Sequence, residues 1–347
     1  MKATRKVLVK LFLFLFSIFF ILLHLTDIFR DRNVVELSKY YYDFEAETFD
    51  VLFFGTSILY SGISPMMLWN EYGIISYNLG AGNESIPMSY YLMKDGIRKD
   101  SPDLVVVDCS FVTNQGKRYY LPYVHYAADN MPYFDRYRFE MIFDIVEPKH
   151  WEQFLIPFTA YHSFQKEAID HLMHPSDPYR PLRINFGGRT GKKTYSGSMF
   201  VRHDLNPDYK LPDISLTYLL KMKDLCAANK ADLLFITLPV IGPNDNCSQE
   251  QFDERRNAAY TLENFCEENH LNYINMVDMT EELNLSGADT YDGFHLNISG
   301  NEKISHYLGD YIRNHFSVPD QRNNEKYAFM ENAYQEFLSW MNNLKTD

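Results

Sequence analysis

Hydrophobic positions along the chain first form one long run and then a series of short runs separated by polar segments. The long run reads LFLFLFSIFFILLHL over residues 11–25, and three apolar residues at 7–9 extend it across Lys10. About 19 apolar residues suffice for a helix that crosses the hydrocarbon of a bilayer, and the long stem of Lys10 can reach the interface. The pattern therefore predicts a transmembrane anchor within residues 1–28.

The charges around this run predict its orientation. Lys2, Arg5 and Lys6 precede it, and such an excess favours a cytoplasmic N-terminus with the remainder of the chain outside. A cleaved signal peptide is the alternative, although HLTD at residues 24–27 offers no pair of small residues for a peptidase. We expect a single-pass protein of the cell membrane, with a charged, tyrosine-rich stem at 29–49 and an extracytoplasmic domain after it.

Short apolar runs bounded by turn residues recur through the rest of the chain and predict buried strands. They lie at 51–54, 74–79, 104–109, 233–238 and 273–277. Helical patterns lie between several of them, at 85–99, 214–229 and 249–269, and another follows at 300–315. Strands that alternate with helices predict a parallel sheet covered on both faces. The expected fold is a three-layer α/β/α domain at 50–316.

This alternation lapses between about 111 and 211, a stretch crowded with Tyr, Phe, His and Pro. Because so long a segment is rarely a simple loop, we expect an aromatic-rich insertion beside the active site. Within it, GGRTGKKT at 187–194 lacks the spacing of a phosphate-binding loop and is interpreted as a basic surface turn. Beyond it, 317–347 is expected to contain a C-terminal helix that packs one face on the domain.

The net charge and the spacing of the cysteines argue against several classes of function. The formal net charge of −13 argues against a nucleic-acid partner, because phosphate binding needs clustered Lys and Arg. The four cysteines show no CxxC spacing, so neither a zinc site nor a thioredoxin-like motif is indicated. Disulfides are permitted outside the cell but not required. The sequence predicts no cofactor and no metal.

A candidate nucleophile follows the first predicted strand. In VLFFGTSILY, Ser57 lies just past the carboxyl end of the strand, where ligands of open parallel sheets collect. Near the end of the chain, YDGFHLNISG places Asp292 and His295 three residues apart, so that one turn can present both. A serine nucleophile needs a base, and the base needs a carboxylate to orient it. Taken alone, the Ser57 segment could be a helix cap, and the Asp292–His295 segment could be a surface turn.

Candidate donors for an oxyanion follow the second predicted strand, in YNLGAGNES. Gly80 and Gly82 permit close backbone approach, and Asn83 adds a side-chain donor. The third predicted strand ends in VVVDCSF, which includes Asp108. Because a carboxylate would repel an oxyanion, Asp108 is assigned no catalytic role.

Taken in this order, the three segments resemble the SGNH (GDSL-like) hydrolase superfamily over roughly residues 50–315. The resemblance implies a flavodoxin-like sheet and a catalytic triad of Ser57, Asp292 and His295. Two departures are visible: no GxND-like block supplies an oxyanion asparagine, and Asn83 occupies the later glycine position of the NLGxxG block. With the N-terminal span, the segments FFGTS, YNLG and DGFHLN look like membrane-anchored cell-envelope proteins of the teichoic-acid D-alanylation (DltD) and alginate O-acetylation types.

This resemblance implies transfer of an acyl group, such as O-acetyl, to or from a cell-envelope polysaccharide or teichoic-acid-like polymer. The reaction would pass through an acyl-serine intermediate, and a membrane-bound O-acyltransferase is the implied partner. Two other readings stay open. An extracytoplasmic carbohydrate esterase or deacetylase would use the same triad, and a polymer-binding scaffold with the same fold would use none.

Overall fold

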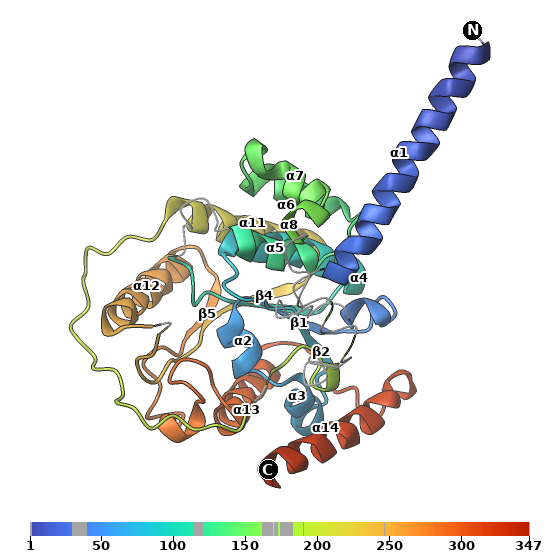
Figure 1. Cartoon of the computed structure of the whole chain (residues 1–347). Coiled ribbons are helices and arrows are strands. Elements are labelled where there is room, and N and C mark those ends of the chain that lie inside the picture. Colours follow the sequence, from blue (N-terminus) through green and yellow to red (C-terminus); the bar gives the residue numbers. More distant parts are fainter. Residues whose placement is uncertain are drawn as a thin grey trace.

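A parallel sheet forms the centre of the domain (Figure 1). The computed structural model describes residues 2–29, 40–113, 121–161, 169, 173, 183–189, 191–245 and 247–346. Over these residues the strands are β1 (Val51–Phe54), β2 (Ser76–Asn78), β3 (Leu104–Asp108), β4 (Asp232–Thr237) and β5 (Asn272–Asn275). Their order, β2-β1-β3-β4-β5, is that of flavodoxin-like sheets. The predicted α/β fold is thereby confirmed, with each strand at its expected place in the sequence.

Alternate side chains of each strand enter two separate hydrophobic layers. Leu52 and Phe54 of β1 belong to one layer, and Val51 and Phe53 belong to the other. Because strand side chains alternate between the faces, a strand covered on both sides is apolar throughout. The continuous apolar runs of the sequence therefore correspond to strands that are buried on both faces.

Helices cover both faces of the sheet and make the fold three-layered (Figure 1). The first layer contains α4 (Ile86–Asp100) and α11 (Asp213–Asn229). The second contains α2 (Ser57–Gly62), α3 (Pro65–Tyr72) and α13 (Ile298–His315). Helix α12 (Gln249–Glu268) packs along β5, and it begins with a capping box in which Ser248 and Gln251 bond each other's backbone.

The predicted N-terminal apolar helix is present as α1 (Lys2–Phe29). Its stretch Arg5–Thr26 is long and apolar enough to cross a membrane, as a membrane anchor or as a signal sequence would. Figure 1 shows α1 projecting away from the sheet, with its N-terminal end far from the domain.

The segment expected as a stem at 29–49 needs a correction. Residues 30–39 lie outside the described residues, but Tyr41 and Phe49 are fully buried in the core, and Phe44 packs against them. The hydroxyl of Tyr41 donates a hydrogen bond to the carboxylate of Asp100 at the end of α4. Burial of large aromatic side chains contributes free energy of folding that a solvent-exposed stem would forgo. The second half of this segment therefore folds with the domain.

The expected insertion lies between β3 and its crossover helix α11. Its described part includes α5 (Leu121–Asp129), α6 (Arg136–Ile145), η3 (Pro148–His150), α7 (Trp151–Leu155) and α8 (Phe158–Tyr161). At the other end of the chain, η5 (Glu325–Tyr327) leads into α14 (Phe329–Thr346), which buries Met330, Phe337 and Met341. Two short helices complete the described elements, η1 (Tyr41–Asp43) and η4 (Gly287–Asp289).

The four cysteines, Cys109, Cys226, Cys247 and Cys266, are all buried and unpaired. Burial raises the pKa of the Cys226 and Cys266 thiols to about 12 in each case. Thiols of this kind are poor nucleophiles at neutral pH, so Cys226 and Cys266 act as small core side chains.

Asp50, immediately before β1, provides a prediction about pH and stability. Its carboxylate accepts a hydrogen bond from Gln321 at 2.6 Å, and burial, opposed by that bond, raises the pKa of Asp50 to about 6. The folded state therefore binds more protons than the unfolded state between about pH 4 and 6. Protonation of Asp50 thus stabilises the fold at low pH, and this stabilisation is lost as pH rises. We expect Asp50→Asn to stabilise the protein by about 1 kcal/mol at pH 7 and not at pH 4. Thermal melting of both proteins across this range checks it, and parallel curves would contradict it.

Candidate active site

Ser57 is positioned by a tight turn at the carboxyl end of β1. Gly55 has φ +148°, and a Cβ there would lie 2.6 Å from the Cβ of Asp108, so only glycine fits without displacing β3. Thr56 caps α2: its hydroxyl oxygen accepts a hydrogen bond from the N–H of Ile58 at 3.2 Å and donates one to Asp108 at 3.0 Å. The turn therefore holds Ser57 as the first residue of α2, with its side chain half-buried.

Asp292 and His295 are presented by a second turn, closed by a bridge between Thr290 and Leu296. The hydroxyl of Thr290 donates to the carbonyl of His295 at 2.5 Å and accepts from the N–H of Gly293 at 2.9 Å. Gly293 has φ +88°, and a Cβ there would lie 2.5 Å from the carbonyl oxygen of Gly242. The glycine in DGFH is thus required by both the conformation and the space.

Packing of α13 against α2 brings these two turns together. The side-chain amide of Asn301 donates to the carbonyl of Ser61 at 3.1 Å. The hydroxyl of Ser305 accepts from the N–H of Ser64 at 2.8 Å. These buried bonds fix the first half of α13 against α2 and against the start of α3, although the segments are far apart in the sequence.

The three predicted catalytic side chains lie in hydrogen-bond contact. Nε2 of His295 is 2.9 Å from Oγ of Ser57, and Nδ1 of His295 is 2.8 Å from a carboxylate oxygen of Asp292. The side chain of His295 is 13% exposed and that of Asp292 is 26% exposed. This is the geometry that a nucleophile, a base and an orienting carboxylate require.

The environment of Asp292 keeps its side chain ionised. Burial by itself would raise the pKa of Asp292, but hydrogen bonds from His295 and from the backbone outweigh this effect and lower it below the ordinary value. The second carboxylate oxygen accepts from the N–H groups of Phe294 at 2.9 Å and of His295 at 2.7 Å. A carboxylate held in this way can fix the imidazole tautomer and stabilise the imidazolium.

Two aromatic rings hold the imidazole in place. The ring of Tyr291 stacks on His295, with centroids 5.3 Å apart and an interplanar angle of 5°. Phe294 approaches edge-on, with centroids 4.9 Å apart. Confined on two sides, the imidazole keeps the rotamer that points Nε2 at Ser57.

Tyr60 and Arg189 lie at the site but were not found by the sequence analysis. Burial raises the pKa of Tyr60, while the nearby charge of Arg189 and hydrogen bonds with Arg189 and Ser57 oppose this. The N–H of Arg189 also donates to the carbonyl of Tyr60 at 2.6 Å. The segment interpreted as a basic surface turn is indeed exposed at Arg189, Lys192 and Lys193, yet it also brings a cation to the site. No local motif signals this, because the approach depends on the path of the insertion.

The candidate oxyanion donors have different surroundings. A Cβ on Gly80 would lie 3.2 Å from the carbonyl oxygen of Thr56, so Gly80 adjoins the nucleophile turn, but its N–H donates to the side chain of Asn78 at 3.1 Å. Gly82 faces the ring of Tyr126 instead. Asn83 is half-buried with φ +54°. Among the contacts of the described residues, none joins Gly82 or Asn83 to the triad.

Two buried carboxyl groups support these loops. Asp108 accepts from Thr56 and from the N–H of Ser110 at 3.0 Å each, and burial, opposed by Arg255 and these bonds, raises its pKa. Glu84 accepts from the N–H of Ala81 at 3.0 Å and from the hydroxyl of Ser89. Asp108 thus braces the nucleophile turn through Thr56.

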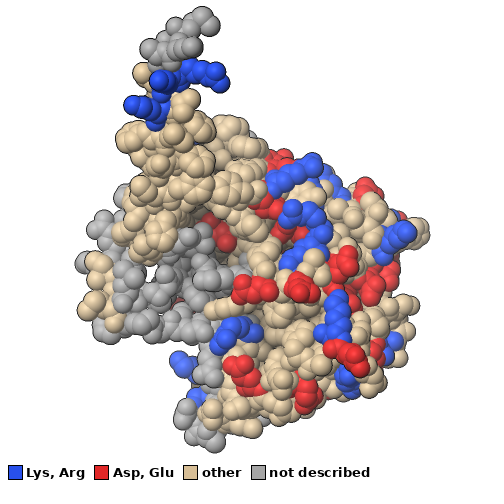
Figure 2. All heavy atoms as spheres, turned by 90° about the vertical axis from the view of Figure 1, so that its right-hand side faces the viewer, with Lys and Arg blue, Asp and Glu red and all other residues tan. Residues whose placement is uncertain are grey.

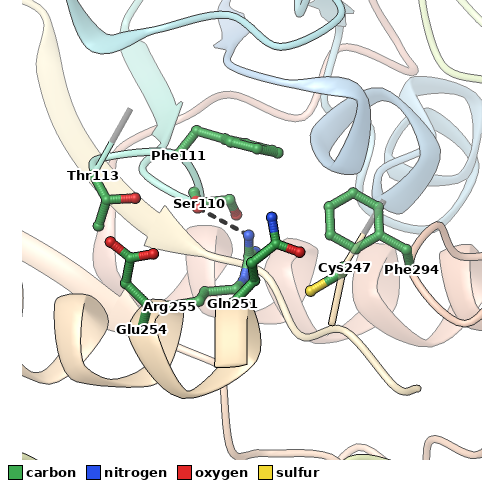
Figure 3. Close-up of a pocket in the computed structure, with 8 residues that line it drawn as sticks. All are labelled: Ser110, Phe111, Thr113, Cys247, Gln251, Glu254, Arg255 and Phe294. Carbon is green, nitrogen blue, oxygen red and sulfur yellow. Dashed lines mark hydrogen bonds between the residues drawn. The ribbon is translucent and has the colours of Figure 1, made fainter. Parts of the chain in front are cut away.

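A pocket of about 310 Å³ opens beyond the carboxyl ends of β3 and β4 (Figure 3). Its lining consists of Ser110, Phe111, Thr113, Cys247, Gln251, Glu254, Arg255 and Phe294. Arg255 donates to the carbonyls of Ser110 at 2.9 Å and of Leu238 at 2.8 Å, which ties the two strand ends together. Because Phe294 also contacts the ring of His295, the pocket adjoins the triad.

Comparison with known proteins gives structural neighbours but no match in sequence. No protein-family model matches the chain, and no curated protein does. Solved structures that resemble it include a GDSL-like lipase from Bacteroides thetaiotaomicron, with 11% identity, a TM-score of 0.41, and 80% of this chain and 98% of the other covered. Another is an acylhydrolase-type protein from Bacteroides fragilis, with 14% identity, a TM-score of 0.39 and coverages of 76% and 86%. With TM-scores this low, the argument about function rests on the site.

Fold and site together define a class of chemistry. A flavodoxin-like sheet presents a serine, a histidine and an aspartate at the carboxyl edge of its strands. Such an arrangement can activate a serine hydroxyl for attack on an ester carbonyl.

Proposed function

We propose that this chain is a membrane-anchored serine enzyme that transfers acyl groups to or from a polymer of the cell envelope. The observation that supports it is the Ser57–His295–Asp292 arrangement, with separations of 2.9 Å and 2.8 Å between successive side chains. The anchor is α1, with the domain on the extracytoplasmic side.

In the first half of the reaction, Oγ of Ser57 attacks the carbonyl carbon of an acyl ester. Nε2 of His295 takes the hydroxyl proton, and Asp292 stabilises the imidazolium through Nδ1. Collapse of the tetrahedral intermediate passes that proton to the leaving alcohol and leaves the acyl group on Ser57. In the second half, His295 takes the proton of an acceptor hydroxyl as that oxygen attacks the acyl-serine. Cleavage of the ester bond to Ser57 releases the acylated acceptor, and His295 returns the proton to Oγ of Ser57.

The negative oxygen of the intermediate needs hydrogen-bond donors. The N–H groups of Ile58, Leu59 and Tyr60 all point back to Thr56, so the N–H of Ser57 is the first of α2 that can face a substrate. Gly80 adjoins this turn, and its N–H would give up its hydrogen bond to Asn78 in order to donate to the oxyanion. Gly82 and Asn83 remain candidates that would have to approach with the bound substrate.

The acceptor decides between transfer and hydrolysis, because both share the acyl-serine. A sugar hydroxyl of a polysaccharide or teichoic-acid-like polymer makes the enzyme a transferase, and water makes it an esterase. The pocket beside Phe294, with the polar side chains of Gln251, Glu254 and Arg255, can bind a hydroxyl-rich acceptor. A membrane-bound O-acyltransferase is the proposed partner that would deliver acyl groups.

Trapping the intermediate tests this proposal. The full-length protein in detergent is mixed rapidly with p-nitrophenyl acetate, and the acylated residue is located by mass spectrometry. We expect one acetyl group on Ser57, formed in a burst of p-nitrophenol. Addition of soluble oligosaccharide should then divert acetyl from water to the sugar. Acetate as the sole product would favour the esterase, and the absence of any acyl-serine would favour a non-catalytic scaffold.

A further inference from the structure

The domain contacts one side of α1 well before the end of the helix. The ring of Phe19 lies with its centroid 6.1 Å from that of Tyr133 and 6.5 Å from that of Phe134. Farther along, Phe29 meets Phe158 of α8 edge-on at 5.7 Å. The contact between helix and domain therefore starts inside the apolar stretch Arg5–Thr26.

Helix length decides where Phe19 lies when α1 spans a bilayer. The apolar stretch has 22 residues, which corresponds to about 33 Å of helix, against a hydrocarbon thickness of about 30 Å. If the helix left the membrane before Phe19, roughly 14 residues or about 21 Å would remain, including Lys10. That is too short, so Phe19 lies within the bilayer. Tyr133 and Phe134, which touch it, then lie at a similar depth.

A continuous series of rings runs from this contact along α6 to α7. Centroids are 4.8 Å apart for Phe134 and Tyr133, 6.4 Å for Tyr133 and Phe139, 6.4 Å for Phe139 and Phe143, and 4.8 Å for Phe143 and Trp151. We call these five side chains the aromatic surface. Phe134 is 64% exposed and Phe143 is 49% exposed, so the protein itself leaves much of this surface uncovered.

The aromatic surface is separate from the core-facing side of α6. Met141 and Ile142 are fully buried in the core, whereas Phe139 and Phe143, four residues apart, share the other side. Aromatic side chains are enriched where a protein meets the interface of a membrane. The charged side chains of Arg136 and Glu140, on the same helix, pair with each other at 2.7 Å.

We propose that the aromatic surface is a second membrane-binding element, which inserts into the leaflet from which α1 emerges. The inference rests on the anchoring role of α1 in the proposed function and goes beyond it. Figure 2 shows Lys and Arg gathered at the far end of α1, with an uncharged length between them and the domain. Two attachments, the helix and the aromatic surface, fix the height and tilt of the domain over the bilayer, which a single helix would not do.

Depth-dependent fluorescence quenching tests this. Phe134→Cys is labelled with NBD in the full-length protein and reconstituted into phosphatidylcholine nanodiscs that carry nitroxide lipids. The matched control is Phe329→Cys, an exposed phenylalanine (39%) at the start of α14. We expect about a twofold or greater loss of fluorescence at position 134, and little loss at position 329. Phe12→Cys, in the middle of α1, reports the anchor itself.

The three positions separate the outcomes. Quenching at 12 and 134 but not at 329 supports the proposal. Quenching at 12 alone overturns it and leaves the anchor intact, whereas no quenching at 12 overturns the anchor and with it this inference. Position 134 could instead be shielded from water in native membranes but not quenched in nanodiscs that contain no other membrane protein. In that case the aromatic surface binds a protein, and the proposal is wrong.

Discussion

Replacing Ser57 with alanine is expected to abolish acyl transfer and ester hydrolysis while leaving the fold intact. The substitution removes the nucleophile, and only the rate from binding and oxyanion donors would remain, about 10⁴-fold or more below wild type. We expect His295→Ala to be comparably severe. Asp292→Ala should be milder, because the imidazole keeps its stacking on Tyr291. Release of p-nitrophenol from p-nitrophenyl acetate measures the rates.

Folding must be checked beside activity. Ser317→Ala is a matched control, because it removes the same hydroxyl from an exposed position outside the site. Both serine variants should melt within about 1 °C of wild type, since neither removes much buried surface. Should Ser57→Ala melt normally and modify the polymer at an undiminished rate, the catalytic role would be excluded and the scaffold would take its place.

The largest expected effect on stability comes from Asp108→Ala. The variant removes the acceptor of Thr56 and Ser110, both of which are buried. It also leaves the buried guanidinium of Arg255 without its neighbouring charge. Lost hydrogen bonds and an uncompensated buried cation together cost about 3 kcal/mol. Because the Thr56 cap positions Ser57, activity should fall as well. Urea unfolding gives the free energy of unfolding.

A double-mutant cycle separates charge from hydrogen bonding. Asp108→Asn keeps the volume and one acceptor, so we expect it to be less destabilising than Asp108→Ala. The double variant Asp108→Asn/Arg255→Met also removes the cation. Its loss in free energy of unfolding should be smaller than the sum of the losses of the two single variants. Strict additivity would mean that the two groups do not interact, and a loss below about 1 kcal/mol for Asp108→Ala would contradict its bracing role.

The sequence by itself determined the five strands and the long helices between and after them, in their order along the chain, but not the short helices of the insertion. Continuous apolar runs bounded by turn residues predicted strands buried on both faces, because a strand covered on one side would alternate instead. The charged and apolar pattern of residues 1–28 predicted the N-terminal helix in the same way. Residue types also determined the candidate chemistry. Ser57 follows the first strand, and Asp292 and His295 are spaced to share one turn.

Only the tertiary structure decided which of these segments meet. Ser57 and His295 approach because α13 packs on α2 and on the start of α3 through buried polar bonds, and no local pattern encodes a contact between such distant segments. For the same reason, the approach of Arg189 to Tyr60 was not visible in the sequence. The burial of Tyr41 and the contact of Phe134 with α1 likewise follow from which surface each ring meets. The periodicity of a sequence indicates whether a residue is buried or exposed. Only three-dimensional packing determines which residues surround it.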